Sequence, residues 1–312
     1  MAPNQHWFDK FVAFAQTAQI AIEYNVSLKE KTTFRLGGAC SVFAKPDTFE
    51  KIALLQQYVI SQAIPHFILG GGSNLLIADS GFAGVVVSMA LPESIEILEP
   101  REQKIRIEIP ASNRAPWTAK QVSQMGYTGL EFLTTIPGDF GGSIIQNAGC
   151  YGYELKDTLI SVKAAVNGKI ETLSRTDCAF SYRNSLFKKQ PHIWVISAML
   201  EIEAGKPEEI AARISDFKER RLASQPKNRR SAGSVYKNPA NYSKKAWQLI
   251  DEAGLRGISI GDAEISPEHC NFIVNRGHAT AHDVYQLMLL IEKTVFEKSA
   301  IQLEREVVLV GF

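Results

Sequence analysis

The chain has 312 residues, of which 45% are hydrophobic and 21% are charged, a composition typical of a soluble globular protein. Lys and Arg total 34 against 33 Asp and Glu, and the resulting net charge of +1 gives no support to a general nucleic-acid or membrane-surface binder. At this length we expect two or three domains.

The amino terminus and the cysteines bear on the cellular compartment. The stretch MAPNQHWFDKFVAFAQTAQI places apolar residues at helical spacing and lacks the features of a secretory signal. No run approaches the ~18 apolar residues expected of a membrane-spanning helix. Cys40, Cys150, Cys178 and Cys270 are scattered without metal-ligand spacing, which favours buried thiols in a reducing compartment. We therefore expect a cytoplasmic protein.

The first two-thirds of the chain predict a strand-rich α+β region. After the amino-terminal helix, the pattern predicts a strand over 40–46 and a helix over 48–62. A helix over 113–126 is expected to end on its terminal glycine. Asn167-Gly168 lies between two extended runs and predicts a hairpin. Further strands are predicted in the runs HFILG, GVVVSM, SIEILEP, KIRIEIP and HIWVISAMLEIEA.

The pattern becomes more helical after residue 205. KPEEIAARISDFKERRLASQ and TAHDVYQLMLLIEKTVFEKS predict long helices, and a helix over 243–254 is expected to start at a serine cap. IQLEREVVLVGF predicts a closing strand. The expected organisation is an amino-terminal helix over 1–22, a domain of two α+β subdomains over 23–205, and a smaller α+β domain over 206–312.

Two glycine-rich segments are candidates for a phosphate-binding site. The first, ILGGGSNLLIAD, fails the dinucleotide fingerprint because the next required glycine falls on Leu75, and the chain contains no P-loop. Taken alone, this segment fits a simple turn equally well. The second, TTIPGDFGGSIIQNAGCYGYEL, is dense in glycine, which lets a ligand approach and leaves backbone N–H groups free to bind an anion. Together they favour a pyrophosphate lying across both segments.

Seven segments occur in the order seen in one enzyme family. They are TTFRLGG, ILGGGSNLLIAD, IPGDFGGSIIQNAGCYG, SYRNSLFK, SAGSVYKNP, GDAEISPEHCNFIVN and LEREV. From about residue 20 to its end, the chain resembles the UDP-N-acetylenolpyruvoylglucosamine reductase (MurB) family. The short path from Tyr182-Arg183 to Ser234 is similar to the shorter of that family's two classes, which lacks an extra substrate-capping loop.

The resemblance implies an α+β fold. Its parts are an FAD-binding domain of the vanillyl-alcohol-oxidase (PCMH) type and a smaller α+β substrate-binding domain with a carboxy-terminal catalytic strand. The implied reaction is the reduction of UDP-N-acetylenolpyruvoylglucosamine to UDP-N-acetylmuramate, with FAD as cofactor and NADPH as reductant. The implied process is peptidoglycan synthesis, and with it cell-wall biogenesis, cell shape, cell division and the cell cycle. The implied partner is a UDP-sugar substrate, and we expect a monomer.

The resemblance also assigns the FAD-binding residues to the two glycine-rich segments. They are Gly70, Gly71, Gly72, Ser73, Asn74, Pro137, Gly138, Gly141, Gly142, Gln146, Asn147 and Gly149.

The same resemblance assigns the two central steps of the chemistry. Ser234 would donate a proton to the carbanion, which requires a dry and pre-aligned site because a serine hydroxyl is a poor acid in water. Without its motif, such a serine would be interpreted as a turn or a cap. Arg183 would clamp the substrate carboxylate with its planar fork and stabilise the charge that develops there. A structural ion pair is the alternative for this arginine.

Three further residues complete the implied site. Glu306 would assist charge stabilisation or proton delivery from the carboxy-terminal strand, and it is chosen over Glu304 because the family's glutamate directly precedes a valine. Lys237 and Asn238 would reach the UDP phosphates or the sugar, although a solvated surface charge is an equal alternative for the lysine.

Two features depart from the family's pattern. The pair after the serine is Val235-Tyr236, where the family usually has two aromatic residues. Val308 stands where the family commonly has an arginine, which puts substrate affinity in question. The alternatives are therefore another FAD-dependent hydroxy-acid oxidoreductase of the same fold and an inactive nucleotide-sugar-binding protein. His278 and His282 are four apart, but without the glutamate of HExxH or a third ligand we expect no metal site.

Overall fold

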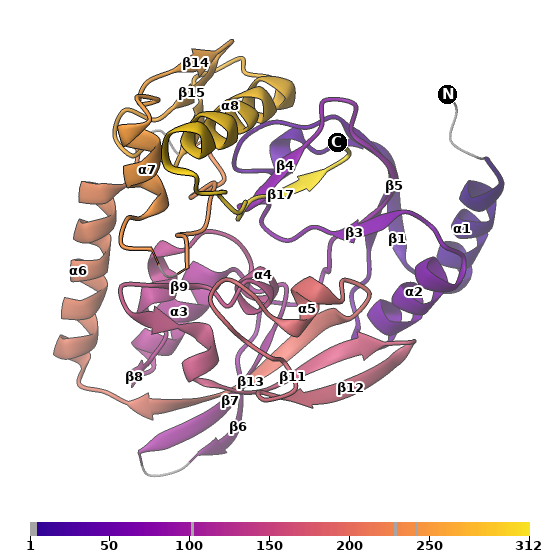
Figure 1. Cartoon of the computed structure of the whole chain (residues 1–312). Coiled ribbons are helices and arrows are strands. Elements are labelled where there is room, and N and C mark those ends of the chain that lie inside the picture. The colour runs from indigo at the N-terminus through magenta and orange to yellow at the C-terminus, as the bar shows by residue number, and fades with distance from the viewer. Residues whose placement is uncertain (1–4, 101–102, 228–229, 241) are drawn as a thin grey trace. The chain divides into compact units, whose positions relative to one another are not determined.

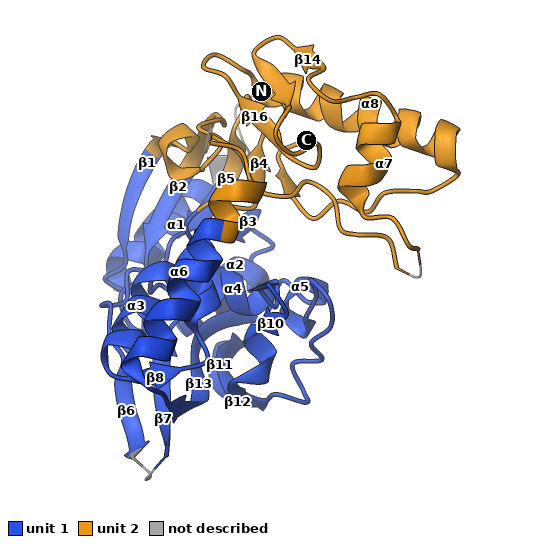
Figure 2. Ribbon diagram, turned by 90° about the vertical axis from the view of Figure 1, so that its left-hand side faces the viewer, with its two compact units in different colours: residues 1–24, 42–71, 84–219 blue, residues 25–41, 72–83, 220–312 orange. Residues whose placement is uncertain are grey.

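The computed structural model describes residues 5–100, 103–227, 230–240 and 242–312 (Figure 1). The chain forms two compact units, each assembled from three segments (Figure 2). Unit 1 comprises residues 1–24, 42–71 and 84–219, and unit 2 comprises residues 25–41, 72–83 and 220–312. Unit 2 thus contains two short segments from the amino-terminal part of the chain. The domain boundaries expected from the sequence remain a prediction.

The larger sheet of unit 1 has the strand order β12-β11-β13-β7-β6, and β8 pairs with the end of β13. These pairs are antiparallel. Asn167 and Gly168 join β11 to β12 with positive φ angles of 49° and 78°, as a two-residue hairpin turn requires, so the predicted hairpin is confirmed. The strands are β6 (Glu96–Pro100), β7 (Lys104–Pro110), β8 (Tyr127–Thr128), β11 (Leu159–Val166), β12 (Lys169–Ser174) and β13 (Trp194–Ala204).

Short helices pack against this sheet. Ile105, Ile107 and Ile109 alternate along β7 and are buried, because every second residue of a strand faces the same side. They share one core with Phe132 and Phe140. The remaining elements here are α3 (Ala115–Gln124), η2 (Glu131–Thr135), α4 (Phe140–Ile145), β9 (Gly149–Cys150), β10 (Tyr153–Glu154), η3 (Leu155–Asp157), α5 (Leu186–Lys189) and α6 (Pro207–Ser224).

A second sheet of unit 1 has the order β1-β2-β5-β3, and β1, β2 and β5 run on into the segments of unit 2. Phe11 and Ile52, from the two helices that accompany this sheet, are buried in one core with Val85 and Trp194. Thr48 caps the second helix by accepting a hydrogen bond from the Lys51 N–H. The elements are α1 (Gln5–Thr17), β1 (Ala21–Ser27), β2 (Ala39–Lys45), α2 (Phe49–Ser61), β3 (His66–Ile68) and β5 (Phe82–Val87).

Unit 2 is built around a long helix, α8, which begins at a Thr280 capping box and buries Val284, Leu287, Met288 and Ile291. A three-stranded sheet of order β14-β15-β16 shares the core. The C-terminal β17, yellow in Figure 1, pairs in parallel with β4. The elements are η1 (Lys29–Lys31), β4 (Leu75–Ile77), α7 (Ala246–Glu252), β14 (Ser259–Ile260), β15 (Ala263–Ile265), β16 (Ile273–Asn275), α8 (Ala281–Ser299) and β17 (Val308–Val310).

Two expectations about unit 2 were wrong in detail. The helix predicted from a Ser243 cap begins at Ala246 with Lys245 as its N-cap. The closing strand spans only Val308–Val310, so Glu306 lies just before the strand and not within it. The reason is that backbone groups of 304–307 bond to the 235–237 segment instead of to a sheet.

In the described ranges no helix is both long and apolar enough to cross a bilayer. The four cysteines are free thiols.

Candidate functional site

The two glycine-rich segments contact each other within unit 1. A Cβ placed on Gly71 would lie 2.6 Å from the Cα of Gly138, so only glycine permits this approach. A Cβ on Gly70 would lie 3.2 Å from Oδ2 of Asp139. The structure therefore brings the start of the first predicted FAD-binding segment against the start of the second.

Glycines of the second segment serve different purposes. A Cβ on Gly141 would lie 2.8 Å from the Ala111 Cβ, so the packing of the chain itself favours glycine there. A Cβ on Gly142 would meet no atom within 4 Å, so this backbone borders open space. The residues present fit a cofactor at Gly142, where a ligand's phosphates or rings have room to approach the main chain.

Asp139 is a charged residue in this loop that the sequence did not single out. Burial raises the pKa of its carboxyl to about 6, while the nearby Arg114 guanidinium lowers this pKa and the Glu93 carboxylate raises it. Arg114 and Asp139 also form an isolated β-bridge. The only sequence signal was an acidic residue inside a glycine-rich segment expected to bind an anion.

Arg183 lies in a tight turn of unit 1. Ser181 and Asn184 exchange backbone hydrogen bonds of 3.0 and 3.1 Å, and Arg183 between them has a positive φ of 53°. Arg183 Nη2 donates to the Gly149 carbonyl at 2.6 Å, and its guanidinium lies 5.2 Å from the centre of the Tyr182 ring. A left-handed arginine is uncommon and costs energy, and such strained residues cluster at functional sites.

Lys188 connects two of the predicted residues and was missed at the sequence level. Its Nζ donates to Gln146 Oε1 at 3.0 Å and to the Arg183 carbonyl at 3.3 Å. The neighbouring Asn147 is fully buried, with a positive φ of 43°, and its Nδ2 donates to the Ser181 carbonyl at 3.1 Å. The predicted FAD-binding segment and the Arg183 turn are thus one hydrogen-bonded assembly.

Ser234 and Glu306 are brought together within unit 2. The Glu306 N–H donates to the Val235 carbonyl at 2.8 Å, and the Lys237 N–H donates to the Glu304 carbonyl at 2.9 Å. These bonds join the 234–237 segment to the 304–307 segment, and both Ser234 and Glu306 are half-buried. Two residues far apart in sequence are therefore held on adjacent segments.

Asn74 holds the other side of the Glu306 segment. Its Nδ2 donates to the Glu306 carbonyl at 3.1 Å, and its own carbonyl accepts from the Val308 N–H at 3.0 Å. Beside it, Gly72 has a positive φ of 60°, and a Cβ there would lie 2.0 Å from the Lys31 carbonyl oxygen. The end of the first glycine-rich segment thus contributes to positioning Glu306.

Lys237 and Asn238 already have partners in the chain. Lys237 Nζ lies 2.5 Å from Glu304 Oε1, and its side chain is 11% exposed. Asn238 Oδ1 accepts from the Ala246 N–H at 3.1 Å, at the start of α7. A phosphate that bound Lys237 would have to share it with the Glu304 carboxylate.

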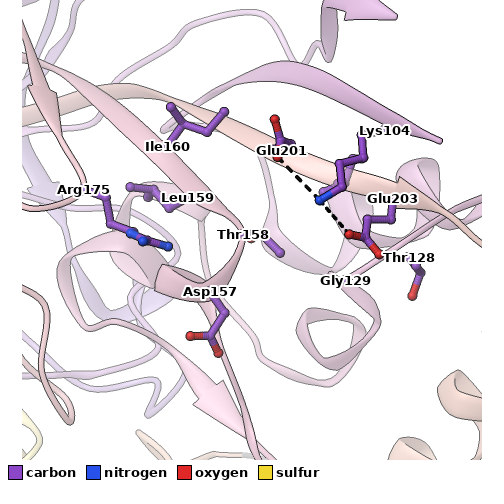
Figure 3. Close-up of a pocket in the computed structure, with 11 residues that line it drawn as sticks. Lys104, Thr128, Gly129, Asp157, Thr158, Leu159, Ile160, Arg175, Glu201 and Glu203 are labelled. Carbon is purple, nitrogen blue, oxygen red and sulfur yellow. Dashed lines mark ion pairs between the residues drawn. The ribbon is translucent and has the colours of Figure 1, made fainter. Parts of the chain in front are cut away.

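A hollow of about 320 Å³ lies in unit 1, and Figure 3 shows the residues that line it. Lys104 in it forms ion pairs of 3.7 Å with Glu201 and 2.8 Å with Glu203. Its lining contains none of the predicted site residues. Across the described part of the chain, no three His, Cys, Asp or Glu side chains are grouped so that they could hold a metal ion.

Comparison with known proteins first defines the class. A sequence model described as an FAD binding domain matches residues 40–174, which include both glycine-rich segments. The mixed helices and strands of the chain accord with this PCMH-type domain. The chain is therefore an FAD-binding protein of the vanillyl-alcohol-oxidase type, and the expected α+β fold class is confirmed.

The particular family follows from closer relatives. A model of the C-terminal domain of UDP-N-acetylenolpyruvoylglucosamine reductase matches residues 225–310. The reductase of that name from Leptospira interrogans is 41% identical, covering 95% of this chain and 94% of the relative, and that of Carboxydothermus hydrogenoformans is 36% identical, covering 92% and 93%. The crystal structure of the Thermus caldophilus enzyme superposes with a TM-score of 0.78 at 32% identity, covering 93% of this chain and 99% of that one. This chain belongs to the UDP-N-acetylenolpyruvoylglucosamine reductase (MurB) family.

Proposed function

We propose that this chain reduces UDP-N-acetylenolpyruvoylglucosamine to UDP-N-acetylmuramate with NADPH, as an FAD-dependent step of peptidoglycan precursor synthesis. The observation that supports the proposal is the backbone hydrogen bond from the Glu306 N–H to the Val235 carbonyl, which joins the segment that follows Ser234 to the segment of Glu306 on the matching motifs. We place the enzyme in the cytoplasm as a monomer, contributing to cell-wall biogenesis and through it to cell shape and division.

FAD is held, in this proposal, by the backbone around Gly70–Asn74 and Pro137–Gly149. Contact between Gly71 and Gly138 and the open space at Gly142 support this placement. When bound, FAD supplies the hydride that it has received from NADPH. The protein's own residues then have to deliver one proton and stabilise the negative charge in the substrate carboxylate.

Ser234 supplies the proton to the carbon next to the one that receives the hydride. Its hydroxyl is a weak acid, so its position must be fixed before the reaction. The half-burial of Ser234 and the backbone hydrogen bonds made by the next residue, Val235, support such a position. The Glu306 carboxyl assists this proton delivery or the stabilisation of charge from the adjacent segment.

Arg183 binds the substrate carboxylate. The Gly149 carbonyl accepts a hydrogen bond from Arg183 Nη2, which orients the planar fork proposed to meet the substrate carboxylate. Because the guanidinium charge is permanent, it favours the electron-rich intermediate over the ground state. Lys237 and Asn238, which follow the Ser234 motif, would reach the UDP phosphates or the sugar, and Lys237 would do so beside the Glu304 carboxylate.

The test is the visible spectrum of the purified protein under anaerobic conditions. We expect flavin bands that bleach on addition of NADPH and return on addition of UDP-N-acetylenolpyruvoylglucosamine. Bands that bleach and stay bleached would indicate that the substrate belongs to another class of hydroxy acid and would overturn the proposal. A protein that cannot be loaded with FAD would overturn it as well.

A further inference from the structure

Side chains next to Ser234 and Glu306 converge on one carboxylate of α8. Tyr236 is two residues after Ser234, and Arg305 directly precedes Glu306. The two are opposite each other in an isolated antiparallel bridge. Both reach Glu292, so one residue of α8 contacts the neighbours of both proposed catalytic residues.

The pair between Arg305 and Glu292 is bidentate. Arg305 Nε donates to Glu292 Oε1 at 2.5 Å, and Nη2 donates to Oε2 at 2.8 Å. The Arg305 guanidinium also lies 5.4 Å from the centre of the Tyr285 ring, and its side chain is 27% exposed. A two-bond fork fixes direction as well as distance, which a single ion pair would not.

The Tyr236 hydroxyl completes the contact. Tyr236 is only 1% exposed, and its Oη lies 2.8 Å from the Met288 carbonyl oxygen and 3.2 Å from Glu292 Oε1. Its single proton is shared between these two acceptors. Desolvation by burial, followed by the nearby Glu292 charge, raises the pKa of Tyr236 above its usual value, so the hydroxyl keeps this proton.

The main chain of Tyr236, opposite its hydroxyl, is held by Asn271. Asn271 Oδ1 accepts from the Tyr236 N–H at 3.0 Å, and Nδ2 donates to the Tyr236 carbonyl at 2.8 Å. The Asn271 carbonyl also accepts from the Val235 N–H at 2.8 Å. The 234–237 segment is therefore held from one side by Asn271 and from the other by Glu292.

We propose that Glu292 is a positioning residue that sets the separation between the Ser234 hydroxyl and the Glu306 carboxylate. The inference rests on the proposed function and deepens it. Glu292 need not contact the substrate, because it acts through Tyr236 on one segment and through Arg305 on the other. Loss of the Glu292 carboxylate would leave Arg305 without its ion-pair partner. The Arg305 side chain could then change conformation, and the adjacent Glu306 backbone could shift with it.

The experiment compares Glu292→Gln with the wild-type holoenzyme in separate half-reactions under anaerobic conditions. We expect FAD reduction by NADPH to keep the wild-type rate. We expect reoxidation by UDP-N-acetylenolpyruvoylglucosamine to slow on the order of 10²-fold, because this step alone needs the proton donor aligned. Glu297→Gln is the matched control: Glu297 lies on the same helix, is 59% exposed, and is 4.0 Å from Lys293. It should leave both rates unchanged.

Two further variants keep the inference testable if Glu292→Gln folds poorly. Tyr236→Phe removes only the hydroxyl, and Arg305→Lys removes only the fork, so each should slow reoxidation selectively and by less. Equal slowing of both half-reactions, together with a lowered melting temperature, would reduce Glu292 to a structural role and overturn the inference. Wild-type reoxidation in all three variants would overturn it too. Failure of the wild-type protein itself to reoxidise with this substrate would instead refute the proposed function.

Discussion

The side-chain amide of Asn74 donates a 3.1 Å hydrogen bond to the backbone carbonyl of Glu306, across 232 positions of the sequence. The contact lies within unit 2 and is continued by the parallel pairing of β4 with β17, in which Leu75 is opposite Val308. It joins a residue predicted to bind the cofactor to a residue predicted to take part in the chemistry. Asn74 consequently acts on the position of Glu306 whether or not it also contacts FAD.

Replacing Asn74 tests this coupling. Asn74→Asp keeps the shape of the side chain but removes the donor, so we expect a loss of about 1 kcal/mol in the free energy of unfolding and slower turnover. Chemical denaturation and steady-state rates measure both. Ser80→Ala, in the exposed turn after β4, is the control and should change neither. An Asn74→Asp variant with wild-type stability and turnover would contradict the coupling.

Ser234→Ala separates proton delivery from cofactor reduction. We expect FAD reduction by NADPH to stay near the wild-type rate and reoxidation by the enolpyruvyl substrate to slow roughly 10²–10⁴-fold, the usual contribution of a positioned acid. Stopped-flow absorbance resolves the two steps. Ser243→Ala, an exposed serine ahead of α7, should behave as wild type. If both steps slowed equally, the role given to Ser234 would be wrong.

Arg183→Lys tests the carboxylate clamp. Lysine keeps the charge but loses the planar fork that also bonds to the Gly149 carbonyl, so we expect kcat/KM for the enolpyruvyl substrate to fall roughly 10²–10³-fold. FAD affinity, measured by flavin fluorescence, should fall by a much smaller factor, because Gly149 is only one residue of the segment proposed to bind FAD. Tyr182→Phe keeps the ring beside the guanidinium and serves as the control. An unchanged kcat/KM in Arg183→Lys would contradict the carboxylate clamp and indicate that Arg183 has only a structural role.

Asp139 should make FAD affinity depend on pH. Asp139 belongs to the second glycine-rich segment, a Cβ on Gly70 of the first segment would lie 3.2 Å from its Oδ2, and burial raises the pKa of its carboxyl to about 6. Above that pH the ionised carboxylate repels the anionic cofactor, so the Kd for FAD should rise with pH, by up to about tenfold per unit. In Asp139→Asn this rise should disappear. Glu93→Gln should move the midpoint to lower pH, because the Glu93 charge raises the Asp139 pKa. Parallel Kd curves for wild type and Asp139→Asn would refute the prediction.

In the absence of FAD, the Asp139 carboxyl should lower the free energy of unfolding once the pH exceeds its folded-state pKa. The folded pKa of about 6 lies above the ordinary value of 3.8, so between these values the folded state binds more protons than the unfolded state. Unfolding free energy should therefore decrease as pH rises through this window. Asp139→Asn should be relatively more stable than wild type above pH 6, as measured by denaturant titration. A wild-type protein that gained stability relative to the variant over this range would contradict the sign.

Much of the local structure followed from the sequence. Asn167-Gly168 predicted its hairpin because few residue pairs accept two positive φ angles. A long helix was predicted over TAHDVYQLMLLIEKTVFEKS and is confirmed as α8, which begins after Thr280. The motif order predicted the family, which the relatives of 36–41% identity confirm. The roles of Ser234, Arg183 and Glu306 remain predictions.

Only the tertiary structure decided how the candidate site is held together. No local pattern could predict that residues 304–307 bond to the 235–237 segment, which places Glu306 ahead of the strand, or that Asn74 supports it. Likewise, Glu292 is an unremarkable helical residue in the sequence, and it becomes the partner of Arg305 only through folding. Local propensities and motifs depend on neighbours along the chain. The hydrogen bonds that position Ser234 and Glu306 join residues distant in sequence, and packing alone determines them.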